Sequence, residues 1–154
     1  MPVRTFSCVA VLLFCALGCQ PKGTGVNTQF VEGVVTLDDA PLNAVSITFV
    51  PKMEGVGENA GGLSDFNGRY TLSSLSGDPG KGALEGEYII LAAKSEPFVF
   101  EKPIVSPVSG DEITSELRPV LHEIYQNRQK TPLSATVVKG KNRIDIKLES
   151  KPSK

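Results

Sequence analysis

Apolar and polar positions alternate along several short stretches of the chain, as they do in half-buried β-strands. The alternation is clearest in the stretch AVSITFV at 44–50 and in the two stretches nearest the C-terminus. The stretch EYIILAAK at 87–94 is apolar almost throughout, which predicts a strand buried on both faces. The predicted strands cover 30–37, 44–50, 69–75, 87–94, 133–137 and 144–148.

Turn residues separate these strands, and the spacing predicts an all-β fold: an antiparallel immunoglobulin-like sandwich of about seven strands. The last two strands flank Lys139-Gly140-Lys141-Asn142, so we expect them to form an antiparallel hairpin. Residues 95–118 contain three prolines and mixed charges, which predicts an irregular insertion. Pro119 interrupts a weak helical spacing, so a turn or two of helix, or an ordered loop, is expected after it.

The first eighteen residues differ from the rest of the chain. Arg4 precedes an apolar run at 6–17, and Gly18 follows it. Twelve residues are too few to cross a bilayer as a helix, which takes about 20 residues. A basic residue, a short apolar run and a small residue at its end are typical of a secretory signal. The alternative is a buried N-terminal strand or helix, but the polar segment that follows does not continue a core.

The end of this run, Ala16-Leu17-Gly18-Cys19, resembles the lipobox of bacterial lipoproteins. The resemblance implies a signal peptide at 1–18, cleavage between Gly18 and Cys19, and attachment of acyl chains such as palmitate to Cys19. It also implies export to the cell envelope, and Gln20 favours the outer over the inner membrane. Ala16 and Leu17 depart from the usual pattern, and the alternative is an ordinary signal peptide that releases a soluble protein.

Composition narrows the function classes. The chain has 154 residues, with 16 basic and 17 acidic side chains and a net charge of -1. Hydrophobic residues make up 40%, which favours one globular domain over disorder. The charge gives no reason to expect nucleic acid as a partner. Cleavage before Cys19 would remove Cys8 and Cys15, leaving no internal disulfide and no cysteine nucleophile in the folded domain.

Three segments together resemble the carboxypeptidase regulatory-like domain, a transthyretin-like (prealbumin-like) sandwich. They are Val31–Pro51, Gly61–Leu72 and Gly82–Lys94. The closing segments, Tyr125, Thr131-Pro132-Leu133, Val137-Val138, Gly140-Lys141-Asn142 and Ile144–Leu148, are similar to the ending of lipid-anchored members. The resemblance covers Phe30–Glu149 and implies a fold rather than an activity.

The predicted organisation has four parts. A signal peptide at 1–18 precedes the lipidated cysteine and a flexible tether at 19–29. The sandwich occupies 30–149 and carries the irregular insertion at 95–118. A disordered tail at 150–154 ends the chain.

Candidate chemistry is sparse. His122 is the single histidine, which leaves no triad or histidine metal site and favours a loop-packing role. Asp65-Phe66-Asn67-Gly68 is typical of a tight turn, and a cation site with Asp38 and Asp39 is the alternative. Glu85 and Glu87 suggest a solvated strand edge rather than a glycosidase pair. We therefore predict no catalytic residue, no metal site and no cofactor.

The remaining function classes are modules that bind. We expect a non-enzymatic, lipid-anchored envelope protein whose sandwich is a structural or protein-interaction module, with 51–62 and 95–118 as contact surfaces. A carbohydrate- or cell-wall-binding module is the alternative, although Tyr70, Tyr88 and Tyr125 have structural explanations. A metal enzyme is a third hypothesis. The basic segment 139–147 favours a lysine-protected strand edge over contact with anionic headgroups.

Overall fold

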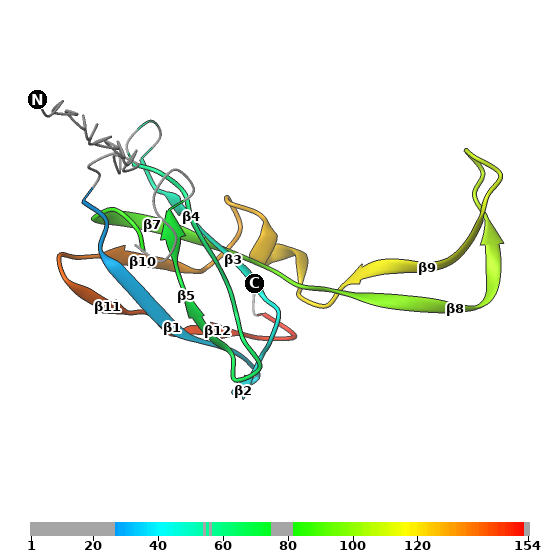
Figure 1. Ribbon diagram of the computed structural model, residues 1–154, viewed down its shortest axis with the longest axis horizontal. Coiled ribbons are helices and arrows are strands. Elements are labelled where there is room, and N and C mark those ends of the chain that lie inside the picture. Colours follow the sequence, from blue (N-terminus) through cyan, green and yellow to red (C-terminus); the bar gives the residue numbers. More distant parts are fainter. Residues whose placement is uncertain (1–26, 54, 56, 75–81, 153–154) are drawn as a thin grey trace, which may run out of the picture.

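The computed structural model describes residues 27–53, 55, 57–74 and 82–152. The signal segment, the Gly18–Cys19 junction and most of the expected tether lie outside these residues. Two sheets pack face to face, and a two-stranded ribbon projects from them (Figure 1). The sequence-based prediction of an all-β sandwich is therefore confirmed.

The first sheet is built around β1 (Phe30–Leu37). On one side β1 pairs antiparallel with β5 (Arg69–Thr71) and β2 (Ala40–Pro41). On the other side it pairs parallel with β11 (Lys141–Arg143) and β12 (Ile146–Leu148). The expected sandwich was wholly antiparallel, so these two parallel pairings are a difference. They arise because the last segment enters this sheet from the opposite sheet.

The second sheet has the order β10 (Ser134–Val137), β7 (Gly86–Ala93), β3 (Ser46–Pro51), β4 (Ala60–Leu63) and β6 (Ser73–Ser74). Neighbouring strands in it are antiparallel. Along β7, buried residues alternate with half-buried ones. The prediction that both faces of this strand are buried is therefore wrong, because no layer covers the outer face completely.

The core fills the space between the two sheets. Val31, Val35, Ile146 and Leu148 of the first sheet share one buried cluster with Ile47, Phe49, Tyr88 and Ile90 of the second. The Phe49 ring is central, because its centroid lies 5.8 Å from that of Tyr88 and 6.5 Å from that of Tyr70. Tilted aromatic contacts of this kind add to the stabilisation that burial provides.

The closing segment does not form the hairpin that the alternation predicts. β10 joins the second sheet and β11 joins the first, so the chain crosses the sandwich between them. Asn142 holds the crossing, since its Oδ1 accepts from the Val138 N–H at 2.9 Å and its Nδ2 donates to the Val138 carbonyl at 2.8 Å. These side-chain bonds replace the backbone pairing of a hairpin.

A 3₁₀-helix, η1 (Glu123–Gln126), follows Pro119, as the sequence predicts. His122 caps it, with Nδ1 accepting from the Ile124 N–H at 3.2 Å. Tyr125 is buried, and its hydroxyl accepts from the Glu149 N–H at 2.9 Å, which ties η1 to the end of β12. No helix in the part of the chain described is long and apolar enough to span a membrane.

Residues 95–119 form an ordered ribbon rather than an irregular insertion. β8 (Ser95–Val105) and β9 (Glu112–Pro119) pair antiparallel, with a register shift between Val99 and Ile104. Prolines are compatible with this pairing because each strand has one edge without a partner strand, and Pro103 lies within the shift. The proline count alone therefore misled the prediction.

The expected tether ends earlier than predicted. Gln29 is only 7% exposed, and its backbone pairs with Ala83. Its side chain donates to Glu85 at 3.1 Å and accepts from the Gly140 N–H at 2.7 Å. The folded domain therefore includes Gln29.

Candidate functional site

The ribbon Ser95–Pro119, here called the arm, is the most exposed segment of the described structure. Its side chains are exposed except for Phe100, Ser106 and Ile113, which are half-buried. Several exposed ones are apolar: Val99 is 69%, Leu117 73% and Val108 95% exposed. Within the described residues, β8 and β9 pair only with each other. Apolar side chains gathered on an unpartnered element are typical of an interaction surface.

The two faces of the arm differ in chemistry. On one face the Phe98 and Phe100 rings meet edge to face at 5.5 Å, and the Arg118 guanidinium lies 3.5 Å from the Phe98 centroid. Glu116 pairs with the same guanidinium. The opposite face carries Val99 and Leu117 without such cover. Aromatic and ionic contacts within the arm therefore cover one face, and the other face presents apolar side chains to solvent.

The base of the arm is fixed to the sandwich. The Lys94 side chain is 8% exposed, and its Nζ lies 2.9 Å from Glu96 Oε1 and 3.2 Å from Asn43 Oδ1. The Lys94 carbonyl also accepts from the Val120 N–H at 2.9 Å. A buried ammonium with two oxygen partners holds its position well, so the sandwich aims the arm in one direction.

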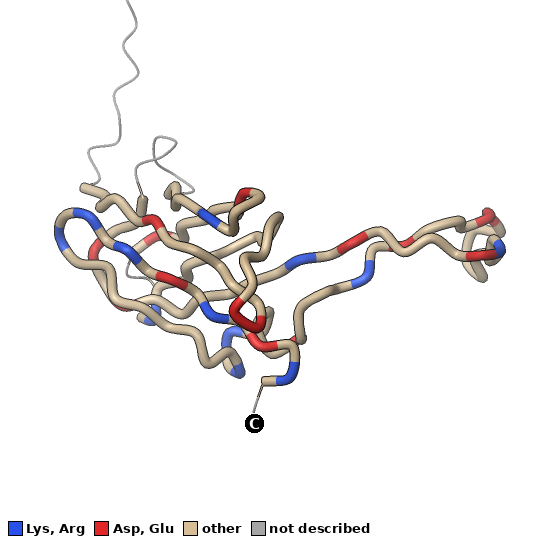
Figure 2. Tube along the Cα trace, turned by 90° about the horizontal axis from the view of Figure 1, so that it is seen from below, with Lys and Arg blue, Asp and Glu red and all other residues tan. Residues whose placement is uncertain are grey.

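The arm is acidic. Its five carboxylates are Glu96, Glu101, Asp111, Glu112 and Glu116, and its two cations are Lys102 and Arg118, which gives a net charge of 2 − 5 = −3. Glu101, Asp111 and Glu112 lie in the distal half, where the red segments gather near the tip of the arm (Figure 2).

The strongest cationic strip of the sandwich is at residues 139–147, here called the basic edge. It comprises Lys139, Lys141, Arg143, Lys147 and one carboxylate, Asp145, with a net charge of 4 − 1 = +3. All five side chains are exposed. β11 and β12 pair with β1 on one side, and no described strand pairs with their other side. β11 lies at the end of the sandwich away from the arm, and β12, which carries Lys147, lies nearer the middle (Figure 1); Figure 2 shows blue segments running inward from that end.

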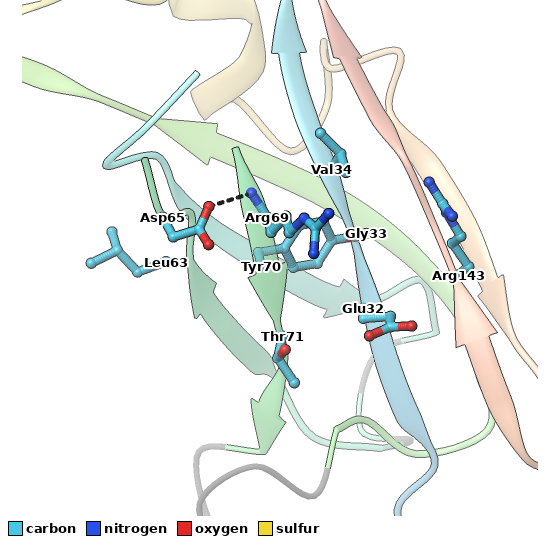
Figure 3. Close-up of a pocket in the computed structure, with 9 residues that line it drawn as sticks. All are labelled: Glu32, Gly33, Val34, Leu63, Asp65, Arg69, Tyr70, Thr71 and Arg143. Atoms are coloured by element: carbon cyan, nitrogen blue, oxygen red, sulfur yellow. Dashed lines mark hydrogen bonds between the residues drawn. The ribbon is translucent and has the colours of Figure 1, made fainter. Parts of the chain in front are cut away.

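A shallow groove of about 610 Å³ lies on the outer face of the first sheet (Figure 3). Glu32 of β1 lies across from Thr71 of β5 and Arg143 of β11, and Arg69 lies further along β5. The cations Arg69 and Arg143 are balanced by Glu32 and Asp65, so the groove has no net charge that selects an ion. The arrangement offers polar contacts but no nucleophile with an adjacent base.

Tyr70 and Gly33 shape the floor of this groove. The Tyr70 hydroxyl donates to the Ile144 carbonyl at 2.6 Å. Burial raises the pKa of Tyr70 well above its usual range, and the negative charge of Asp145 adds to the shift. A Cβ on Gly33 would lie 1.8 Å from the Ile144 oxygen, so only glycine allows β1 this close to the β11–β12 junction. These features are structural.

The carboxylates singled out in the sequence also have structural roles. Asp65 accepts from the backbone N–H groups of Asn67 and Arg69, each at 2.8 Å, so the turn prediction is confirmed. Asp38 accepts from the Ser150 N–H at 3.1 Å, and Ser150 is thereby tied to the sandwich rather than part of a disordered tail. The described residues contain no group of three or more side chains placed to hold a metal, so Asp38, Asp39 and Asp65 do not form a common site.

The remaining candidates lie apart or inside. Glu85 accepts from Gln29, and Glu87 pairs with Lys52 at 3.2 Å, so the two carboxylates do not act as a pair. Tyr70, Tyr88 and Tyr125 are 3%, 1% and 2% exposed, as expected for structural residues. Sequence reasoning placed a contact surface at 95–118 but missed its strand structure. The available signal was the β-branched and aromatic residues at 98–100 and 104–105, followed by a Ser-Pro-Val-Ser-Gly stretch that is typical of a turn.

The sequence has no match among models of known protein families, and none among curated proteins. Two solved structures align with part of the chain at TM-scores below 0.5. A 9R-lipoxygenase from Cyanothece PCC8801 aligns with 80% of this chain at 13% identity and a TM-score of 0.39. A DUF3823 family protein from Parabacteroides merdae aligns with 80% at 11% identity and a TM-score of 0.38. The chain spans 16% of the first protein and 46% of the second, so neither assigns a function.

Proposed function

We propose that this chain is a bacterial lipoprotein, held in the cell envelope by acyl chains on Cys19, whose sandwich presents the arm to another protein. The lipobox-like Ala16-Leu17-Gly18-Cys19 supports the anchor. Two or more acyl chains hold a protein stably on a membrane, whereas one does not. The resemblance to carboxypeptidase regulatory-like domains is consistent with a binding role and no chemistry of its own.

The observation that carries the protein-interaction role is the arm. An isolated two-stranded ribbon is only marginally stable in water, and this one leaves an apolar face and both outer strand edges without partners in the described structure. Strand edges and apolar faces of this kind are completed by another polypeptide. The contacts of the buried Lys94 side chain with Glu96 and Asn43 fix the direction in which the arm is presented.

The alternative role, binding of sugars or cell-wall polymers, has less support. Sugar-binding sandwiches stack their ligands on exposed aromatic rings, and all three tyrosines of this chain are buried. Phe66 is 89% exposed, but it is a single ring in the Asp65–Gly68 turn rather than part of an aromatic face. The Phe98 ring on the arm is 41% exposed, but Arg118 already lies over one face of it. The protein-interaction role is therefore the proposal.

Two experiments test this function. Cys19→Ser should move the protein from the membrane fraction to the soluble fraction of cells, and unchanged membrane association would refute the anchor. A photo-crosslinking residue at Val99 should form adducts with protein in intact cells. The same residue at Phe66, which is 89% exposed in the turn between β4 and β5, is the matched control and should not. Absence of any protein adduct from Val99 would refute the interaction role.

A further inference from the structure

We infer that the partner of the arm is a second copy of this chain, with the arm of one copy docking along the basic edge of the other. The inference rests on the proposed function and names its partner. It starts from charge. The arm carries a net charge of −3, so a basic surface is the complementary one, whereas anionic headgroups and a second arm would both repel it.

The chain itself supplies that basic surface. Residues 139–147 carry a net charge of +3 along an edge that no described strand covers. Lysine on an exposed edge discourages pairing with ordinary strands, because an incoming strand would bury unneutralised charge. A strand rich in carboxylates removes that penalty, so the lysines select for an acidic arm.

The arrangement in space requires two molecules. β11 lies at the opposite end of the sandwich from the arm, and the arm points away from it (Figures 1 and 2). β8 has 11 residues and extends by about 35 Å at the rise of a strand. An arm of this length, fixed at its base, reaches another molecule and cannot fold back onto its own basic edge.

Exposed pairs of opposite charge are available for the contact. Glu101 and Glu112 on the arm, and Lys141 and Lys147 on the edge, are all exposed, and the described structure gives none of these four side chains a hydrogen bond or ion pair. Reversing their charges should therefore disturb the contact between copies without disturbing either fold.

The test uses the full chain in cells, with a photo-crosslinking residue at Val105, which is 66% exposed in the distal half of the arm. We expect an adduct of twice the chain mass whose crosslinked peptide contains residues 139–147. The pair Lys141→Glu and Lys147→Glu should lower its yield about tenfold, because two attractive pairs become repulsive. Lys130→Glu, on the loop after η1, makes the same charge change as either edge substitution at a site outside the basic edge, and it should leave the yield unchanged.

The arm pair Glu101→Lys and Glu112→Lys should lower the yield equally when expressed alone. Expressed together, the arm-reversed and edge-reversed chains should crosslink to each other at the original yield, and this rescue shows that both fold. Failure of the rescue would overturn the inference. Adducts with a different protein would overturn it but leave the proposed function standing. Absence of protein adducts from both Val105 and Val99 would overturn both.

Discussion

The Tyr70 hydroxyl is a single group whose removal should change stability in opposite directions at neutral and alkaline pH. Tyr70 is 3% exposed and donates to the Ile144 carbonyl at 2.6 Å. Tyr70→Phe keeps the ring against Phe49 but leaves that carbonyl without this donor. Losing a buried hydrogen bond of this kind should lower the free energy of unfolding by about 1–1.5 kcal/mol at pH 7.

At high pH the effect of Tyr70→Phe on the free energy of unfolding reverses sign. Burial raises the pKa of Tyr70, so in the unfolded chain the phenol ionises near its ordinary value of about 10 while in the folded protein it stays protonated. The unfolded state then binds fewer protons than the folded one, and stability falls as pH rises. The loss approaches about 1.4 kcal/mol per pH unit above pH 10. Tyr70→Phe lacks this loss, so the stability curves of the wild type and the variant should cross at about pH 11.

Urea titrations of both proteins between pH 7 and 11.5 measure the effect. Phe49→Leu is the control, because it also weakens the core but leaves every phenol in place. Its curve should run below the wild-type curve by a constant amount. Wild-type and Tyr70→Phe curves that stay parallel up to pH 11.5 would refute the reasoning, since they would mean that Tyr70 ionises as easily in the folded protein as in the unfolded chain.

Three further predictions concern the scaffold. Gly33→Ala should lower the free energy of unfolding by more than about 2 kcal/mol, since the added Cβ meets the Ile144 oxygen. Gly55→Ala, with open space around it, should cost only about 1 kcal/mol of backbone strain, and equal losses in urea titrations of the two variants would contradict this. Replacing Pro97–Leu117 by Asn-Gly keeps the Lys94–Glu96 pair and should change that free energy by less than about 1 kcal/mol, because within the described residues β8 and β9 pair only with each other; calorimetry showing a large loss would count against an independent arm. Hydrogen bonds from the hydroxyl and the N–H of Ser150 lower the pKa of Asp38, so its stabilisation should persist down to its ordinary pKa and vanish as pH falls through the lowered one; an NMR titration midpoint at or above the ordinary value would disprove it.

The sandwich was predictable because its signals are local. The stretch 30–37 matches β1 residue for residue, and 87–94 matches β7 within one position. Turn chemistry at Asp65 also follows from neighbouring residues, since its carboxylate bonds to N–H groups two and four positions ahead. Local alternation says that a strand is half-buried, but it does not say which sheet the strand joins.

The parts that were not predictable depend on contacts far apart in the sequence. β10 and β11 are separated by a turn typical of a hairpin, yet Asn142 takes the backbone bonds that would have closed it. The sequence predicts that Gln29 belongs to a flexible tether. In the structure its side chain is held by Glu85 and Gly140, which lie 56 and 111 residues away. The arm was misread because prolines, which break central strands, are tolerated in a ribbon with two open edges.

The net charge of the chain conceals how the fold distributes it. Summed over 154 residues the net charge is -1, a value that argues only against polyanionic partners. The fold places an arm of −3 and an edge of +3 on different parts of the molecule, with β11 at the end of the sandwich away from the arm. Opposite charges placed that far apart in one chain attract poorly within a molecule, because salt screens them beyond about 10 Å. Between two molecules the arm of one copy can contact the basic edge of the other. The same separation that prevents the arm and the edge from pairing within one molecule therefore favours their pairing between molecules.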